Sequence, residues 1–251
     1  MTLAAELARR DLPTLLVDAD PYGGSVAQQL GVLEEVSGLL AAARLAAAGT
    51  LAERGASVRR RLSDRLSLVT GLPRADRWAE VRPDTLGRLV ADARLEATVV
   101  VDTGFSLEWE SGGDPLARPA RNGLTLEALE AADEVVAVGS ADPVGLARLA
   151  RGLGELRDRA PGAVVRVVVN RMRPTLGWSE GDVSAMLAGF GADRGIHLLP
   201  DDQPALDRAL VAGRTPVEEG ESPFTRAVAA LVDAMPGMPP APRAPRRRLR
   251  R

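Results

Sequence analysis

Three aspartates follow apolar runs, at positions where a parallel sheet would present functional side chains. Asp18 and Asp20 follow TLLV in TLLVDADPYGGS, and Asp102 follows TVVV in TVVVDTG. Strand side chains alternate with period two, so we expect Asp18 and Asp20 to point the same way. Such carboxylates can hold a hydrated magnesium ion or orient a water molecule. The alternative is that Asp18 closes a turn and Asp20, before Pro21, begins one.

The composition excludes several other chemistries. All 32 basic residues are arginine, there is no cysteine, and His197 is the only histidine. Schiff-base lysine chemistry, thiol catalysis, thiolate zinc sites and multi-histidine metal sites therefore cannot come from these residues. His197, in IHLLP, has no acidic or serine partner arranged as a triad, so we expect a structural role for it. A bound metal would need oxygen ligands, which suits magnesium.

Short apolar strands alternate with amphipathic helices along the chain. The predicted strands are Thr14–Val17, Leu66–Val69, Thr98–Val101, Glu134–Val138, Val164–Val169 and Ile196–Leu199. The predicted helices are Leu39–Ala48, Asp84–Ala93, Leu124–Ala131, Val144–Arg159, Glu180–Ala188, Pro204–Ala212 and Pro223–Ala234. Asp142, Gln203 and Ser222 precede prolines at three helix starts and are candidate caps. The pattern predicts an α/β fold with a doubly wound, mostly parallel sheet flanked by helices.

The remaining segments set the domain boundaries. Residues 1–235 are predicted to form one folded domain, and 106–122 a long polar loop. Residues 236–251 hold five prolines and six arginines and are predicted to be a disordered basic tail. Outside that tail the chain has 26 arginines and 34 acidic residues, so the predicted domain is acidic and the tail is basic. Three consecutive arginines, 59–61, are interpreted as the solvated face of a helix, with a DNA-contacting patch as the alternative.

We do not expect the stretch MTLAAELARRDLP to be a signal peptide, because Glu6 interrupts its short apolar run, and no apolar run in the sequence approaches the roughly 20 residues of a membrane span. We therefore expect a cytoplasmic protein that could sit peripherally at a membrane. The arginine tail could contact DNA or anionic lipid weakly, since each charge contributes about 1 kcal/mol near an anionic membrane. A simply solvated tail is the alternative.

An ordered series of segments resembles the MinD/ParA family of deviant-Walker P-loop ATPases. The series runs from TLAAELARR and PTLLVDADPYGGSVAQQLG through VVVDTG to ADEVVAVGSADPVGLARLARGL, then VVVNRMRP and HLLPDDQPALDRALVAGRTPVEEGESPFTRAVAALV. It spans roughly residues 1–235 and looks closest to CpaE-like members, which are linked to the localisation of pili or secretion systems. The resemblance implies a P-loop NTPase-like fold that binds ATP and Mg²⁺.

The resemblance also implies roles for individual residues. Asp20 matches the residue that orients the attacking water, and Asp18 and Asp102 match acidic residues that hold magnesium through water. The residues that match the adenine-reading pair and the loop over the base are Asn170, Arg171, Pro200, Asp201 and Asp202. From the residues alone, the Asn170 amide suits a base edge, because it both donates and accepts; a turn-forming Asn170 and a solvated Arg171 are the alternative.

One family feature has no counterpart in the sequence. Members begin with a strand and a KGGxGKT-type loop that binds the phosphates, whereas this chain opens at Met1-Thr2, within the helix that should follow that loop. We therefore expect the first strand and the phosphate-binding loop to be missing. Either the start is misassigned, or the protein is a degenerate relative that does not hydrolyse ATP. The presence of Asp18, Asp20, Asp102 and Asn170 favours the first explanation.

The resemblance implies an ATP-gated positioning or regulatory factor, acting in septum placement, chromosome partitioning or pilus and secretion localisation. It implies that the protein is an ATPase and that it forms a homodimer when ATP binds. It also implies a protein partner that belongs to a positioning or secretion system. The alternative is a non-catalytic α/β scaffold or pseudo-ATPase that works through protein contacts. A dinucleotide oxidoreductase is disfavoured, because no GxGxxG follows a first strand.

Overall fold

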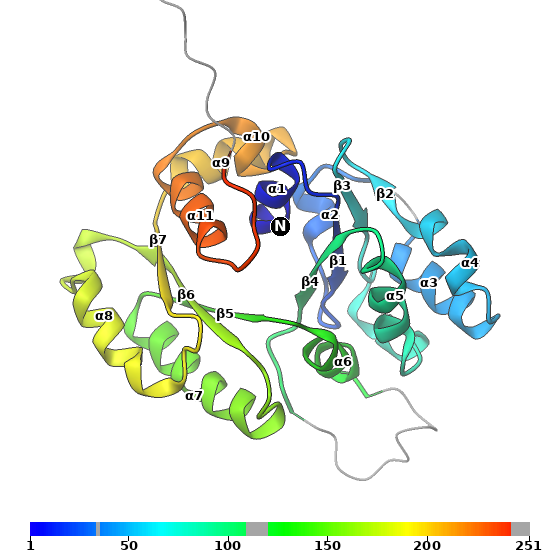
Figure 1. Cartoon of the computed structure of the whole chain (residues 1–251), viewed down its shortest axis with the longest axis horizontal. Coiled ribbons are helices and arrows are strands. Elements are labelled where there is room, and N and C mark those ends of the chain that lie inside the picture. Colours follow the sequence, from blue (N-terminus) through cyan, green and yellow to red (C-terminus); the bar gives the residue numbers. More distant parts are fainter. Residues whose placement is uncertain (34–35, 109–119, 242–251) are drawn as a thin grey trace, which may run out of the picture.

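The computed structural model describes residues 1–33, 36–108 and 120–241 (Figure 1). The strands are β1 (Thr14–Ala19), β2 (Arg60–Arg61), β3 (Leu66–Val69), β4 (Thr98–Thr103), β5 (Val135–Ser140), β6 (Val165–Met172) and β7 (Ile196–Pro200). The helices are α1 (Thr2–Arg9), α2 (Val26–Gln29), α3 (Gly38–Ala47), α4 (Leu51–Arg54), α5 (Thr85–Ala93), α6 (Gly123–Ala131), α7 (Pro143–Arg159), α8 (Glu180–Leu187), α9 (Gln203–Ala212), α10 (Pro216–Glu219) and α11 (Pro223–Asp233). Within these ranges no helix is long and apolar enough to cross a membrane.

The described strands form two sheets, with helices packed on their faces. One sheet has the order β2-β3-β1-β4 and the other β5-β6-β7. All pairs are parallel except β2 with β3. The predicted α/β class with a mostly parallel sheet flanked by helices is confirmed, with the strands divided between two sheets.

Alternation along the strands explains how both faces of each sheet are buried. Leu15 and Val17 of β1 pack with α3 and α5 residues, whereas Leu16 packs on the opposite face with α1. In the second sheet, Val167 and Val169 of β6 pack toward α7 and α8, and Val168 packs toward α11. Apolar residues at every position are what a strand covered on both faces requires.

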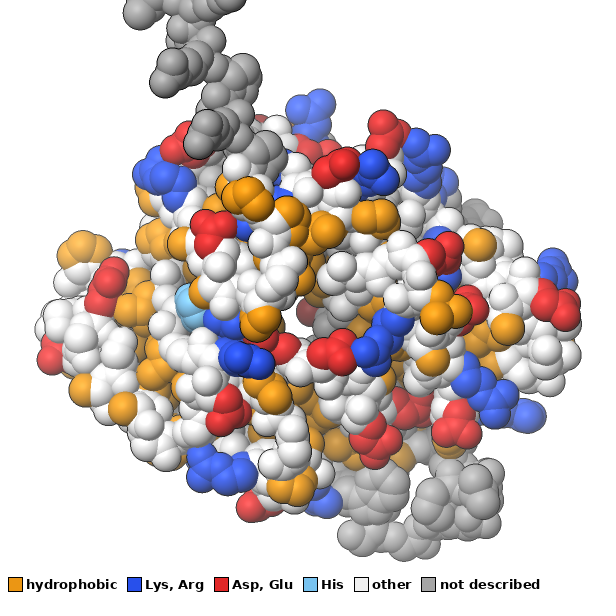
Figure 2. Space-filling model, viewed as in Figure 1, with side chains coloured by type: hydrophobic (Ala, Val, Ile, Leu, Met, Phe, Trp, Pro, Cys, Tyr) orange, Lys and Arg blue, Asp and Glu red, His pale blue; other side chains and the backbone are white. Residues whose placement is uncertain are grey.

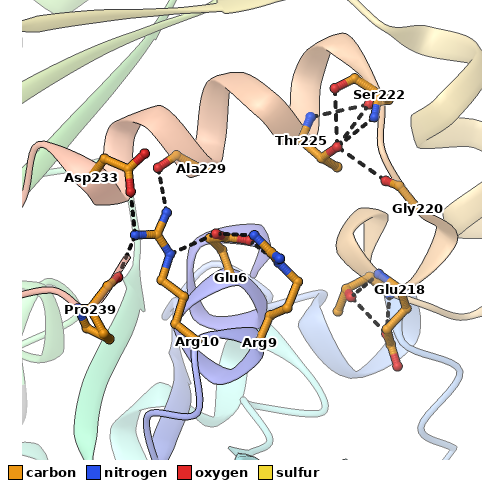
Figure 3. Close-up of polar contacts among 11 residues, drawn as sticks. Glu6, Arg9, Arg10, Glu218, Gly220, Ser222, Thr225, Ala229, Asp233 and Pro239 are labelled. Carbon is orange, nitrogen blue, oxygen red and sulfur yellow. Dashed lines mark hydrogen bonds and ion pairs between the residues drawn. The ribbon is translucent and has the colours of Figure 1, made fainter. Parts of the chain in front are cut away.

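Two buried arginines fix the C-terminal part of α11. Arg10, next to α1, donates to the Asp233 carboxylate (2.6 Å) and to the carbonyl oxygens of Ala229 (2.7 Å) and Pro239 (2.8 Å), as Figure 3 shows. Arg166 of β6 donates to the Ala234 carbonyl (3.1 Å). The two guanidinium groups therefore tie the last turns of α11 and the segment after it to the end of α1 and to β6.

The predicted elements begin within one residue of the observed ones, and two of the three proposed caps are confirmed. Asp142 accepts from the Gly145 amide (2.9 Å), and Ser222 forms a capping box with Thr225. Gln203 is not a cap: α9 begins at Gln203, and Asp202 occupies the cap position.

The helical interpretation of residues 59–61 is wrong. Arg60 and Arg61 form β2, pairing with Leu68 and Ser67, because the turn that follows them returns the chain antiparallel to β3. Both are exposed, as predicted. Arg59 forms ion pairs with Asp92 and Glu96. The predicted loop falls partly, at 109–119, outside the described residues, as does most of the predicted tail, at 242–251.

Candidate functional site

Asp18 and Asp102 lie side by side at the carboxyl ends of adjacent strands. They are register partners in the β1–β4 pair. The Asp18 side chain is almost fully buried, with 1% of its surface exposed. Its Oδ2 accepts from the Val26 amide (3.1 Å), and its Oδ1 lies 3.4 Å from the Asp20 amide. Asp18 therefore closes the turn after β1 and also stands beside a second carboxylate.

Two glycines form the walls around the Asp18 carboxylate. A Cβ atom on Gly24 would lie 1.9 Å from Asp18 Oδ1, and one on Gly71 would lie 2.7 Å from it. Both distances are far inside van der Waals contact, so neither position accepts a side chain unless the carboxylate moves. Sequence reasoning missed this role, although PYGG after β1 and TGLP after β3 mark both positions.

The environment favours the neutral form of these carboxyls. Burial raises the pKa of Asp18 to about 6, and the nearby charges of Asp102 and Asp20 add to the shift. Desolvation also raises the pKa of Asp102, whose residue surface is exposed but whose carboxyl is crowded by protein atoms. The positive charge of the Met1 amino group opposes the upward shift in the pKa of Asp102. Burial lowers the pKa of the Met1 amino group itself. Carboxyls desolvated next to one another are typical of sites that bind a cation.

Asp20 lies close by but has different neighbours from Asp18. Its Oδ1 accepts from the Tyr22 amide (2.9 Å), the turn-forming role considered above. A Cβ on Gly104, after β4, would lie 3.1 Å from the same oxygen. The loop carrying Asp20 is therefore packed against the segment that follows Asp102.

Sequence reasoning also missed a network that holds this loop in place. The Tyr22 hydroxyl donates to Asn122 Oδ1 (2.7 Å), and Asn122 Nδ2 donates to Ser106 Oγ (3.2 Å) and to the Glu108 carbonyl (2.7 Å). The Tyr22 ring packs on Phe105, with ring centroids 4.8 Å apart. No local pattern pairs Tyr22 with Asn122, because the two are 100 residues apart.

The five residues matched to base recognition gather at the carboxyl ends of β6 and β7. Asn170 Oδ1 accepts from the Arg171 amide (2.8 Å), and Arg171 adopts a left-handed conformation with φ of 64°. Pro200 pairs with Met172. The Asp201 amide donates to the Met172 carbonyl (2.8 Å). These residues lie on the other sheet from the three aspartates.

Asp202 continues this edge toward α11. A hydrogen bond from the Ser222 side chain, and a weaker one from the Phe224 amide (3.4 Å), lower the pKa of Asp202. His197 does not join the site: its Nε2 lies 2.8 Å from Arg166 Nη1. Burial and the Arg166 charge lower the pKa of His197.

Among the described residues no group of three or more acidic, histidine or cysteine side chains is arranged to hold a metal by itself. The two edges therefore offer different chemistry. The β1–β4 edge presents carboxylates in register on adjacent strands, and the β6–β7 edge presents an amide, a guanidinium and the carboxylates of Asp201 and Asp202.

Sequence comparison with protein-family profiles and with curated proteins gives no match. Comparison of structures does. The chain resembles a ParA family ATPase from Chlorobium tepidum TLS, with a TM-score of 0.72 at 16% identity over 92% of this chain and 91% of that one. It resembles MinD in the MinC:MinD cell division complex of Aquifex aeolicus (TM-score 0.66, 16% identity, 90% and 84% covered). It also resembles the septum site-determining protein MinD complexed with Mg-ADP from Pyrococcus horikoshii OT3, with a TM-score of 0.61 at 16% identity over 92% of this chain and 87% of that one.

These likenesses cover nearly the whole of each chain, while the sequences share less than a fifth of their residues. The chain has the fold of the ParA and MinD ATPases.

Proposed function

We propose that the protein binds ATP with magnesium through the carboxyl edges of its two sheets. The observation that carries the proposal is the Asp18–Asp102 pair, two desolvated carboxyls in register on adjacent strands of a ParA/MinD fold. Two carboxyls kept together at a cost in electrostatic energy are expected where a cation offsets their charge.

The donors at this edge fit magnesium. Carboxylate oxygens are hard ligands, and magnesium usually keeps several waters and takes only one or two protein carboxylates. Asp18 and Asp102 would hold the ion through such waters. Each oxygen of Asp18 faces one backbone amide, and the remaining lone pairs of the carboxylate could accept from water bound to the ion. Bound magnesium would neutralise phosphate charge, and Asp20 would orient the attacking water.

The β6–β7 edge would take the base. Asn170 would read its edge, with Arg171 beside it, while Pro200, Asp201 and Asp202 would form the loop over it. Support comes from their gathering at one edge, where doubly wound sheets bind ligands.

At the level of the cell, we propose an ATP-gated positioning or regulatory factor of the MinD/ParA kind, closest to CpaE-like members. It would form a homodimer on ATP binding and act on a protein partner at a septum, a chromosome or a secretion system. One structural relative, MinD of Aquifex aeolicus, is in complex with MinC. Cytoplasmic location, with contact to DNA or anionic membrane through the basic tail, belongs to the same proposal.

A scaffold without catalysis is the second candidate, and a specific observation favours it. Asp18, Asp20 and Asn170 each accept backbone hydrogen bonds that explain their presence without a ligand. Under this alternative the same fold would act through protein contacts alone.

Calorimetric titration with ATP in the presence of magnesium separates the two candidates. We expect binding that weakens at least tenfold in Asp102→Asn and in Asn170→Ala, and that is unchanged in Asp76→Asn, where an exposed carboxylate pairs with Arg74. Asp20→Asn should keep binding and lose hydrolysis. Absence of binding to the unaltered protein at millimolar ATP would support the scaffold.

A further inference from the structure

The buried guanidinium of Arg166 holds four segments of the chain together. Arg166 lies in β6 with 1% of its surface exposed. Its Nε and Nη2 donate to the Glu134 carboxylate just before β5, and Nη2 donates also to the Ala234 carbonyl after α11 (3.1 Å). Nη1 donates to the Arg194 carbonyl (3.0 Å), and it also lies 2.8 Å from His197 Nε2 in β7. All five N–H donors of the guanidinium are therefore engaged.

This arrangement requires one protonation state of His197. A guanidinium only donates hydrogen bonds, so Nε2 must be the ring nitrogen without a proton. The imidazole is then neutral, with its proton on Nδ1. A protonated imidazole carries a hydrogen on both nitrogens and would place a second positive charge beside Arg166. His197 is the only histidine of the chain and is partly exposed, so protons reach it from solvent (Figure 2, pale blue).

The elements packed around the imidazole contribute charges of both signs. Burial opposes its protonation, and so does Arg166 on β6, whereas the Glu134 carboxylate before β5 favours it. Arg194, before β7, favours it through its backbone, and its side chain lies 3.9 Å from Glu134. On α11, the Asp233 carboxylate is bound by Arg10 (2.6 Å). Burial and Arg166 prevail, so the pKa of the imidazole lies below the ordinary 6.5 and the ring is neutral at neutral pH.

The Ala234 carbonyl is where this network meets the C-terminal segment. Ala234 follows α11 and leads into residues 235–241. The second buried arginine, Arg10, holds the same stretch through the carbonyls of Ala229 and Pro239 (Figure 3). Histidine is the side chain that ordinarily changes charge between pH 5 and 8, and the only one in the chain contacts the other arginine. Of the two anchors, only the one at Ala234 is therefore expected to respond to mild acid.

We propose that the contact between Arg166 and His197 is a pH-sensitive latch on the segment that follows α11. At neutral pH the imidazole accepts from Arg166, and the guanidinium holds the Ala234 carbonyl on β6. When Nε2 takes up a proton it can no longer accept, and two cations lie within hydrogen-bonding distance of each other. Their repulsion displaces the guanidinium from Ala234, whereas the other buried arginine keeps its contacts. The start of residues 235–241 is thereby released, and this stretch leads to the arginine-rich residues 242–251.

Hydrogen exchange of individual amides, followed by NMR, tests the latch. No nucleotide is added, so the result is independent of ATP binding. The amides of Ala234 and Met235 report on the latch, because they donate to carbonyls in the last turn of α11 (3.2 and 3.0 Å). The β6 amides report on global unfolding. Rates are compared at pH 7.5 and pH 5, after correction for the intrinsic pH dependence of exchange.

Three variants separate the latch from other effects of acid. His197→Gln keeps an acceptor for Arg166 at both pH values, and His197→Lys keeps a positive charge at both. Glu221→Gln is the matched control, because it removes an exposed carboxylate next to α11 that pairs with Arg226.

In the unaltered protein we expect the two reporter amides to exchange about fivefold faster or more at pH 5, relative to the β6 amides. Glu221→Gln should show the same acceleration, His197→Gln should lose it, and His197→Lys should exchange fast at both pH values. The same acceleration in His197→Gln would overturn the proposal, as would no acceleration in the unaltered protein or an equal one in β6. If His197→Gln did not fold, the nitrogen chemical shifts of the imidazole in the unaltered protein would decide. A proton on Nε2 at pH 7.5 would contradict the latch, and a proton on Nδ1 alone would support it.

Discussion

Two strand-end aspartates, one in each sheet, respond to folding in opposite directions. Asp18, after the buried part of β1, is desolvated and stands near two other carboxyls, so its pKa rises to about 6. Asp202, after β7, accepts hydrogen bonds from Ser222 and Phe224, so its pKa falls. The charged form of Asp18 opposes folding, whereas the charged form of Asp202 favours it.

The two sheet edges therefore differ in their electrostatics. We call the β1–β4 edge strained, because folding raises the pKa of its carboxyl, and the β6–β7 edge relaxed, because hydrogen bonds lower the pKa of Asp202. At the β1–β4 edge, the backbone amides that face Asp18 and the amino group of Met1 offset the desolvation of the carboxylates only in part, and an added cation would offset more of it. At the β6–β7 edge, Asn170 and Asp202 already have partners on the backbone or on a side chain. Unfavourable electrostatics retained in a fold point to function, so the first sheet is where a ligand should change stability most.

Gly24 and Gly71 enclose the Asp18 carboxylate in a tight niche, and the largest expected effect comes from adding a side chain to one of these glycines. Gly24→Ala places a Cβ where it would meet Asp18 Oδ1 at 1.9 Å, and the buried carboxylate has little room to move. We expect a loss of about 3 kcal/mol or more in the free energy of unfolding, as for a strongly overpacked site. Urea denaturation measures it.

The matched control is Gly154→Ala in α7, where an added Cβ meets nothing within 4 Å. There the substitution should stabilise the protein by about 0.5–1 kcal/mol, because alanine restricts the unfolded chain. Equal stabilisation by both substitutions would show that the Asp18 niche is not tight.

Removing the charge of Asp18 should have the next largest effect, with the opposite sign. The folded pKa lies above the ordinary value of 3.8, so the favourable contribution of Asp18 is present below that value and is lost as pH rises through about 6. At pH 7.5 we therefore expect Asp18→Asn to be more stable than the unaltered protein by about 1–3 kcal/mol. The gain should nearly vanish at pH 4, as denaturation at the two pH values would show. A less stable variant at pH 7.5 would mean that the charge is already compensated.

The strained edge was easier to predict from sequence than its surroundings. Apolar runs ending in aspartate identified β1, β4, Asp18 and Asp102, because buried parallel strands leave a strong local pattern. The walls at Gly24 and Gly71 and the Tyr22–Asn122 bond depend on contacts between distant segments, which no local pattern records. Arg60 and Arg61 were assigned to a helix because three arginines alone do not reveal a turn that pairs them with β3. The division into two sheets also became visible only from strand order.

In the second sheet, His197 should give a smaller response to pH, opposite to that of Asp18. Burial and the Arg166 charge lower its pKa below 6.5, so its contribution to stability is present above that value and is lost as pH falls. His197→Gln keeps a group that can accept from Arg166 but takes up no proton. Between pH 7 and pH 5, we expect this variant to lose less stability than the unaltered protein in parallel urea titrations. Identical slopes would show that the imidazole is fully solvated in the folded state.

The smallest expected effect tests the relaxed edge itself. The pKa of Asp202 is lowered, so its contribution is present above the ordinary value of 3.8 and is lost as pH falls through the folded pKa. Asp202→Asn retains one oxygen that can accept from Ser222 but loses the charge, so we expect a slightly lower Tm at pH 7 and no difference near pH 2. Asp201→Asn, which alters the exposed neighbouring residue, is the matched control and should leave Tm unchanged. If Asp202→Asn instead stabilised the protein at pH 7, the β6–β7 edge would be strained like the β1–β4 edge, and the assignment of magnesium to one sheet and the base to the other would lose its electrostatic support.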